Sequence, residues 1–336
     1  MRLSSLRNLG IILEKTSAPF ESQAVCNPTC IEKDGVVHMF YRAIAPRNRS
    51  SIGYCQIKDG KVIQRSAQPI LVPEYEYEKQ GVEDPRIVFF EGLYYLFYTA
   101  YDGVNALVAY ATSPDLTHFT KKGLITPTIL NTEVREILKT LPDPIYGRYI
   151  DNDTAKDAYV WEKDAFIFPE RINGKLMLVH RIMPGIQCIP FSNFSELTNA
   201  RWKDYFKRLS EHIILDPLFP FENEKIGGGC PPINTEAGWL LIYHAVEKNR
   251  SSFIYHAAAA LLDRSDPTKV IGRLPYPLFS PQEEWEKNGD VHDVVFPSGA
   301  VVRGDELIIY YGAADTRIGA KSLSMSELIT ELKNNP

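Results

Sequence analysis

Polar and charged residues recur at matched positions within an otherwise apolar repeat of this 336-residue chain. Five times a proline precedes a turn glycine and an aromatic-rich run, and the position seven residues after the glycine holds Arg42, Thr99, Arg181, Ala245 or Tyr311. His180, His244 and Asp315 lie close to these positions, and the residues before the first three prolines are Asn27, Asp84 and Phe168. Burying a charge is costly unless it is paired or liganded. A set of such residues therefore indicates a bound polar ligand.

The five copies read as β-hairpins. They are NPTCIEKDGVVHMFYRA from Asn27, DPRIVFFEGLYYLFYTA from Asp84, FPERINGKLMLVHRI from Phe168, PPINTEAGWLLIYHA from Pro231 and FPSGAVVRGDELIIYYGA from Phe296. Each glycine stands in a short polar break between apolar runs, where it supplies the positive φ that a tight turn requires. The runs after the glycines are rich in β-branched and aromatic residues, as buried strands are. The third copy has a shorter interval from proline to glycine than the other four.

This repeat predicts an all-β chain folded as a five-bladed β-propeller, one catalytic domain over residues 1–336. Spacings of 57, 84, 62 and 66 residues between the prolines suit four-stranded blades. A β-sandwich with unrelated hairpins is the alternative. In a propeller, matched ends of the inner strands converge on one axial mouth, so residues far apart in sequence meet there. Taken alone, Asp84-Pro85 also fits a turn that Asp84 caps.

Two segments depart from the repeat. The longest spacing predicts a rim insertion over about residues 125–160, with helical periodicity in Asn131–Thr140 and irregular chain over Pro142–Lys156. A short closing helix is expected at the C-terminus, where Ser324 and Glu327 form a capping box. The Glu283–Glu286 stretch reads as a solvated charged turn without chemistry.

Composition limits the possible partners. The net charge of −5 argues against a nucleic-acid surface. The N-terminus has no apolar run long enough for a secretory or membrane segment. Five scattered cysteines without a CxxC pair predict reduced thiols, and neither disulfides nor a metal site. We expect a cytoplasmic protein without nucleic-acid or membrane partners, which could form a homo-oligomer.

Several long motifs resemble glycoside hydrolase family 130, which contains β-mannoside phosphorylases and mannosidases. They are Gly81–Ile87 (GVEDPRI), Phe168–Lys175 (FPERINGK), Lys225–Ala245, Ala259–Arg273 and Val294–Thr316. The similarity runs from about residue 25 to residue 320, with the motifs in the family's order. The family is a five-bladed propeller, in agreement with the repeat count.

The resemblance assigns roles to individual residues. Asp84 matches the general acid, which in the family is thought to act through a hydroxyl of the mannose ring. The positions that hold inorganic phosphate, the co-substrate, correspond to Lys163, Arg181, Lys225, His244 and Tyr255. The sugar-binding candidates are Asn27, Arg42, Arg86 and Asp315. Phosphate carries nearly two negative charges, so several fixed cationic donors are needed to hold it beside a sugar. No other cofactor is implied. Gly227–Gly229 is either an anion nest or a plain loop.

Three positions depart from the family pattern. Lys163-Asp164 replaces a common Arg-Asn pair, Tyr255-His256 replaces Tyr-Arg, and Ser50-Ser51 replaces Ser-Arg. Lysine lacks the bidentate fork of arginine, and Asp164 adds a like charge beside the expected anion. Both changes weaken the phosphate assignment.

The predicted reaction is inverting phosphorolysis of a β-mannoside to α-mannose 1-phosphate. The alternative is an inverting β-mannosidase, in which Glu170, Glu247 or Asp164 would activate water about 6.5–9.5 Å from the acid. Retention of Arg181, Lys225 and His244 favours the phosphorylase. A non-catalytic carbohydrate-binding propeller would need neither the acid nor the cations. The sequence does not predict the linkage or the acceptor sugar.

Overall fold

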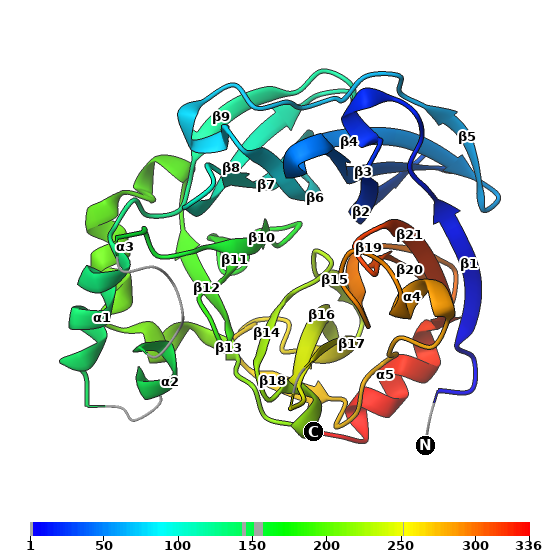
Figure 1. Ribbon diagram of the computed structural model, residues 1–336. Helices are drawn as coiled ribbons and strands as arrows, with labels where there is room; N and C mark the ends of the chain where they lie inside the picture. The colour runs from blue at the N-terminus through cyan, green and yellow to red at the C-terminus, as the bar shows by residue number, and fades with distance from the viewer. Residues whose placement is uncertain (1–2, 143–145, 151–156, 251) are drawn as a thin grey trace.

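The structure is an all-β assembly of four sheets arranged around a common centre (Figure 1). It is a computed structural model that describes residues 3–142, 146–150, 157–250 and 252–336. No helix in this part of the chain is long and apolar enough to cross a membrane. All five cysteines are buried free thiols.

The strands follow the chain from sheet to sheet. The eight-stranded sheet contains β2 (Ala24–Lys33), β3 (Val36–Ala45), β4 (Arg49–Lys58), β5 (Lys61–Arg65), β6 (Gly81–Phe90), β7 (Leu93–Tyr101), β8 (Ala106–Ser113) and β9 (Thr120–Leu124). The next contains β10 (Lys163–Ile167), β11 (Leu176–Arg181), β12 (Ile186–Phe191) and β13 (Ile213–Leu215). The third contains β14 (Lys225–Gly228), β15 (Ile233–Thr235), β16 (Gly238–Lys248), β17 (Phe253–Leu262) and β18 (Val270–Arg273). The last contains β19 (Val295–Arg303), β20 (Glu306–Ala313), β21 (Arg317–Ser324) and β1 (Arg7–Leu13).

The eight-stranded sheet divides into two antiparallel groups, β2–β5 and β6–β9. One parallel pair, Ser50 with Gly81, joins them. The chain therefore forms five strand groups in sequence order. In the last group the N-terminal strand β1 pairs with the C-terminal strand β21, so the two ends of the chain share a sheet.

The predicted hairpin turns are present. Asp34-Gly35 between β2 and β3, and Glu91-Gly92 between β6 and β7, have positive φ at both residues. That geometry belongs to the two-residue turns whose twist matches antiparallel strands. Gly304, between β19 and β20, also has a positive φ of 60°.

Three bulges aim polar side chains toward the centre. The register of the first two strands of a group shifts between Cys26 and Thr29, between Glu83 and Arg86, and between Lys163 and Phe166. Asn27, Asp84 and Asp164 lie in these shifts with φ of 47°, 50° and 55°. Asn and Asp tolerate this left-handed conformation better than other residues with side chains. The equivalent of Asp84 in the third group is therefore Asp164, and the predicted equivalence with Phe168 is wrong.

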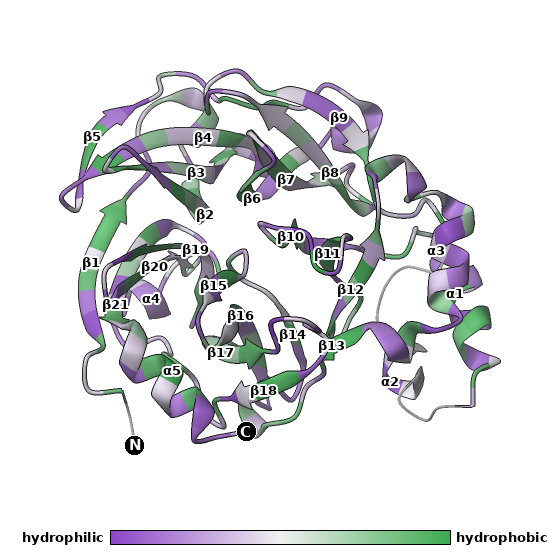
Figure 2. Ribbon diagram, turned by 180° about the vertical axis from the view of Figure 1, so that it is seen from behind, coloured by the Kyte–Doolittle hydropathy of each residue, from purple (hydrophilic) through white to green (hydrophobic). Residues whose placement is uncertain are grey.

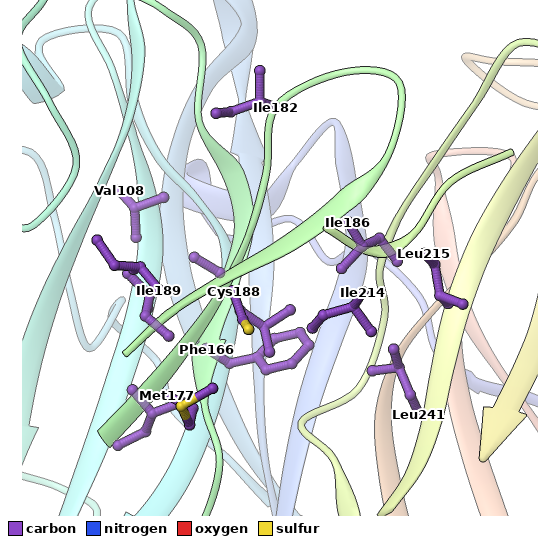
Figure 3. Close-up of a cluster of buried hydrophobic side chains, with 14 of the residues drawn as sticks. Val108, Phe166, Met177, Ile182, Ile186, Cys188, Ile189, Ile214, Leu215 and Leu241 are labelled. Carbon is purple, nitrogen blue, oxygen red and sulfur yellow. The ribbon is translucent and has the colours of Figure 1, made fainter. Parts of the chain in front are cut away.

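Neighbouring sheets are held together by buried side chains. Figure 3 shows Phe166 of β10 and Ile189 of β12 among Val108 of β8, Leu215 of β13 and Leu241 of β16. These five side chains are at most 2% exposed. Fully burying such a side chain contributes about 1.5–3 kcal/mol relative to exposing it.

Buried ion clusters recur in four of the five strand groups. In each, a glutamate from a short helical turn accepts a hydrogen bond from a strand tyrosine and pairs with a basic side chain. The four sets are Glu21–Tyr41–Arg65, Glu78–Tyr98–Lys121, Glu222–Tyr243–Arg273 and Glu286–Tyr311–Lys321. The third group has Glu162, His180 and Tyr205 instead. The prediction of a solvated Glu283–Glu286 turn is wrong at Glu286, which is completely buried.

The helices are α1 (Asn131–Lys139), α2 (Tyr146–Ile150), α3 (Asn199–Phe206), α4 (Glu284–Lys287) and α5 (Met325–Lys333). Helix α1 confirms the helix expected over Asn131–Thr140. Helix α2 lies within Pro142–Lys156, which was expected to be irregular. Residues 143–145 and 151–156 of that segment lie outside the described residues. Helix α5 mixes hydrophilic and hydrophobic residues in Figure 2, and its Leu328 and Leu332 are buried. Ser324 caps it by accepting from the Glu327 backbone N–H. The Glu327 carboxylate instead accepts from Ser4 and Ser5, so the predicted capping box is only half formed.

Candidate active site

A cavity of about 270 Å³ lies where the strand groups converge, and every group contributes to it. Its walls are formed by Asn27, Arg42, Asp84, Trp161, Lys163, Asp164, Arg181, Met183, Lys225, Tyr255, Val291, Val294, Phe296 and Asp315. Eight of the ten predicted site residues are in this set. Arg86 and His244 do not line the cavity, and both are completely buried against the residues that do.

Asp84 lies at the junction between acidic and basic groups. Its Oδ1 accepts a hydrogen bond of 2.8 Å from Asn27 Nδ2 and lies 3.8 Å from an Arg42 guanidinium nitrogen. Burial alone would raise the pKa of Asp84, but Arg42, Lys163 and the Asn27 hydrogen bond hold it below its usual value. Without a ligand, Asp84 is therefore ionised at neutral pH.

The pKa of Asp315 is shifted in the opposite direction. Burial raises its pKa to about 6, and the nearby charge of Asp84 adds to this effect, while Arg42 acts against it. Two carboxyl groups in one cavity with divergent pKa values are typical of sites that handle protons.

Arg42 and Lys163 share one counter-ion beneath the cavity. Arg42 donates a 2.7 Å hydrogen bond to Glu83 Oε1, and Lys163 Nζ lies 3.8 Å from Glu83 Oε2. Glu83 itself is buried and does not line the cavity. It fixes both cations next to Asp84 while leaving them open to the cavity.

Lys225 is the first residue of β14, in the fourth strand group, and its side chain lines the cavity. Burial lowers its pKa to about 8, and the positive charges of Arg181 and Lys163 contribute. A lysine held near other cations gains most from a bound anion, because the anion offsets both the repulsion and the loss of hydration.

Asp164 is the counter-ion of the second arginine. Its Oδ2 lies 2.9 Å from Arg181 Nη1, and its Oδ1 lies 3.6 Å from Arg86 Nη2. Arg181 Nη1 is also 3.3 Å from His244 Nε2. Burial, together with Arg181 and Arg86, lowers the pKa of His244 well below its usual value. His244 is therefore a neutral hydrogen-bonding group rather than a cation.

Four buried polar atoms around the cavity have no hydrogen-bond partner among the described residues. They are Asn27 Oδ1, Asp164 Oδ2, Arg181 Nε and His244 Nδ1. Buried polar atoms in proteins are nearly always paired. They belong to residues from three strand groups, so the pairing of buried polar groups is least complete next to the cavity.

Arg86 lies beneath the cavity floor. It donates to the carbonyl oxygens of Gly228 and Gly229 at 3.3 and 2.5 Å, and to those of Asp84 and Pro85. The glycine run is the strand β14 and its continuation, and none of its residues has positive φ, so it is not an anion nest. A Cβ at Gly227 would come within 2.7 Å of Asp164 Oδ2 and 2.4 Å of the His244 ring. Glycine is needed there because these side chains occupy the space.

Sequence reasoning missed several cavity residues. Asp164 was named as a candidate base and as a like charge beside the anion, but its place in the third bulge was not predicted. The signal for that place is that Lys163 pairs with Arg181 as Cys26 pairs with Arg42. Phe296 stands before Pro297, at the position that Asn27 and Asp84 hold before their prolines, and was not singled out. Trp161, Met183, Val291 and Val294 have no counterpart in the repeat that would mark them. Tyr41 and Tyr311 of the aromatic-rich runs are completely buried in the ion clusters and do not line the cavity.

Comparison with known proteins identifies the family. The family model described as beta-1,4-mannooligosaccharide phosphorylase, glycoside hydrolase family 130, matches residues 2–334. The chain belongs to glycoside hydrolase family 130. A family 130 relative, the 1,2-beta-oligomannan phosphorylase of Thermoanaerobacter sp. strain X514, is 35% identical over 98% of this chain and 99% of its own. The beta-1,2-mannobiose phosphorylase of the same organism is 36% identical over 95% of this chain and 96% of its own.

A solved structure shares the fold of this family 130 chain. The Listeria innocua beta-1,2-mannobiose phosphorylase in complex with beta-1,2-mannobiose superposes with a TM-score of 0.74 over 98% of this chain and 99% of its own. The sequence identity is 23%, so this likeness concerns the fold. No group of three or more His, Cys, Asp or Glu side chains that could hold a metal ion occurs in the described ranges.

Proposed function

We propose that the chain is an inverting β-mannoside phosphorylase, which converts a β-linked manno-oligosaccharide and phosphate to α-mannose 1-phosphate. One observation carries the proposal: a single cavity holds the Asp84 carboxylate together with the side chains of Lys163, Arg181 and Lys225. The acid and the anion site that phosphorolysis needs are thus adjacent. Two relatives matched over nearly their full length are named as phosphorylases.

We also propose that the five strand groups are the blades of one five-bladed propeller, residues 1–336. Their order around the centre and the sharing of a sheet by β1 and β21 support this interpretation (Figure 1). The cavity then corresponds to the axial mouth, where bulges in three blades place Asn27, Asp84 and Asp164.

In the proposed reaction, a phosphate oxygen attacks C1 of the mannose as the bond to the leaving oxygen breaks. Asp84 supplies the proton for that oxygen, relayed through a mannose hydroxyl as the family resemblance implies. Asp84 must be protonated for this step, although its pKa is lowered without ligand. Bound phosphate would offset the charge of Lys163, one of the groups that lower the pKa, and so favour the protonated acid.

Phosphate is proposed to contact Lys163, Arg181, Lys225 and Tyr255. His244 then accepts a hydrogen bond from Arg181 through its neutral ring and holds that guanidinium beside the anion. Asn27, Arg42 and Asp315 line the cavity and are placed to bind the sugar. We assign Arg86 to positioning, because its guanidinium is committed to backbone carbonyls and Asp164.

The linkage proposed is β-1,2. The two relatives that match at least 95% of this chain are named for β-1,2-linked substrates. The Ruminococcus albus beta-1,4-mannooligosaccharide phosphorylase matches only 52% of it. The family description refers to β-1,4 linkages, so a comparison of β-1,2- and β-1,4-mannobiose as substrates tests this point.

Phosphate dependence tests the main proposal. Mannose 1-phosphate formation from β-1,2-mannobiose should rise with phosphate and be negligible without it. Equal mannose release in phosphate-free buffer would instead select the mannosidase. Of the three bases considered for that alternative, Glu170 and Glu247 do not line the cavity, and Asp164 is paired with Arg181. A cytoplasmic location and a homo-oligomeric state stay predictions.

A further inference from the structure

Asp164 places a hydrogen-bond acceptor inside a cluster of donors. Its carboxylate lines the cavity, is 3% exposed, and lies between Arg181, Arg86 and His244. Its Oδ2 is the counter-ion of Arg181, 2.9 Å from Nη1, and is packed against Gly227. A ligand in the cavity meets the Arg181 guanidinium and the Asp164 carboxylate together, so an anion that can donate a proton to the carboxylate avoids its repulsion.

We propose that Asp164 accepts a hydrogen bond from the protonated oxygen of bound hydrogen phosphate, and so makes the site selective for phosphate and arsenate over sulfate. This inference rests on the proposed phosphorylase function. Phosphate and arsenate retain a proton on one oxygen near neutral pH, whereas sulfate has none. A sulfate oxygen facing Asp164 would leave two negatively charged acceptors in contact without a proton between them, in a buried site where such repulsion is strong.

The cavity holds carboxylates beside its cations. Arg42, Lys163, Arg181 and Lys225 are opposed by Asp84, Asp164 and Asp315, all lining the same space. Hydrogen phosphate and sulfate both carry two negative charges, so their total charge does not distinguish them. The proton that hydrogen phosphate can share with Asp164 does distinguish them.

The rival interpretation is that Asp164 serves only as a counter-ion that orients Arg181 and Arg86. In that case, removing its charge would change the binding of all tetrahedral anions alike. Glu83 offers the matched control, because it is a buried carboxylate of the same network that pairs with Arg42 and Lys163 and does not line the cavity. Glu83→Gln therefore removes an equal charge without touching the anion.

The experiment measures phosphorolysis with phosphate, arsenolysis with arsenate, and inhibition by sulfate. In the wild type, sulfate should compete at least about tenfold more weakly than arsenate, since the site rejects an anion that cannot donate. Asp164→Asn presents an amide donor and keeps the left-handed φ accessible, so its ratio of sulfate inhibition constant to phosphate KM should fall by about tenfold. Glu83→Gln should leave that ratio unchanged.

Two results would overturn the inference. One is sulfate competing as strongly as arsenate in the wild type, which needs no variant and holds even if Asp164→Asn does not fold. The other is a sulfate-to-phosphate ratio that is the same in Asp164→Asn and the wild type. Neither result affects the proposed function, which fails only if the wild type does not consume phosphate.

Discussion

Two sets of buried charges in this molecule look alike in composition and differ in how completely they are paired. In the four Glu–Tyr–cation clusters, each carboxylate receives a tyrosine hydroxyl and a lysine or arginine at 2.6–2.8 Å. Around the central cavity, Arg42–Glu83 and Arg181–Asp164 are 2.7 and 2.9 Å apart, but Arg42–Asp84 and Lys163–Glu83 are 3.8 Å apart, and four polar atoms lack hydrogen bonds. The first set is complete within the protein, while the second needs a ligand.

The difference follows from position within each strand group. The clusters fix a short helical turn to a strand of the same group, where a rigid and fully paired network stabilises the fold. The cavity residues come from the central ends of strands in different groups, where no single group can complete the pairing. Incomplete pairing of buried charge raises the free energy of the empty site, and a charged ligand recovers it.

The largest expected effect is at the acid. Asp84→Asn should lower kcat by about 10²–10⁴-fold, because the amide cannot deliver a proton. The fold should persist, since asparagine has nearly the same shape and already occupies the equivalent bulge at position 27. Steady-state kinetics and a thermal unfolding curve of the same preparation check both statements. Substantial residual turnover by a folded variant would remove Asp84 from the acid role.

Breaking a complete cluster should affect stability instead. Glu222→Gln removes the charge that pairs Arg273 and accepts from Tyr243 and two backbone N–H groups. We expect a loss of about 3–5 kcal/mol in the free energy of unfolding, because a buried arginine is left uncompensated. Urea unfolding measures the loss, and kcat per folded molecule should not change.

The exposed pair Lys139–Glu136 provides a control for that measurement. Both side chains are more than half exposed. Glu136→Gln should therefore change the free energy of unfolding by less than about 1 kcal/mol. Similar losses for Glu222→Gln and Glu136→Gln would contradict the structural role of the buried cluster.

The two sets also differed in how far the sequence could predict them. The cavity residues recur at one place in each hairpin, and Pro28 and Pro85 mark two of the bulges, so Asn27 and Asp84 could be recognised. The third bulge has Ala165 in place of proline, and its hairpin is two residues longer, so Pro169 directed attention to Phe168 instead of Asp164.

The ion clusters were not predicted. Each joins a glutamate to a tyrosine and a cation that lie 20 or more residues further along the chain, as in Glu21, Tyr41 and Arg65. Glu286 was hidden in an acidic stretch that is usually solvated. Arg86 was predicted to bind the sugar, because it lies close to Asp84 in the sequence. The bulge instead places its side chain beneath the cavity floor, where it donates to backbone carbonyl oxygens.

The phosphate side of the cavity should show a pH dependence that the clusters lack. Lys225, with its pKa lowered to about 8, binds an anion when protonated. The KM for phosphate should therefore rise as pH increases from 8 to 9.5. Lys225→Met should raise KM at pH 7 by about 10–100-fold, the worth of a charged hydrogen bond of about 1.5–3 kcal/mol.

Lys225→Arg is the matched control for this pH effect, because arginine stays charged throughout the range. Its phosphate KM should rise less between pH 8 and 9.5 than that of the wild type. An identical rise in both proteins would assign the pH dependence to another group.

The smallest effects come from deleting one hydroxyl in each region. Tyr41→Phe removes the buried 2.8 Å hydrogen bond to Glu21 and the acceptor of the partly buried Arg65 Nε, and should cost about 1–3 kcal/mol of stability. Tyr255→Phe removes a hydroxyl from the cavity wall and should raise phosphate KM severalfold with little loss of stability. Urea unfolding and phosphate kinetics on both variants test the pair. If Tyr41→Phe raised KM, or Tyr255→Phe lowered stability as much, the separation between complete and incomplete charge clusters would not hold.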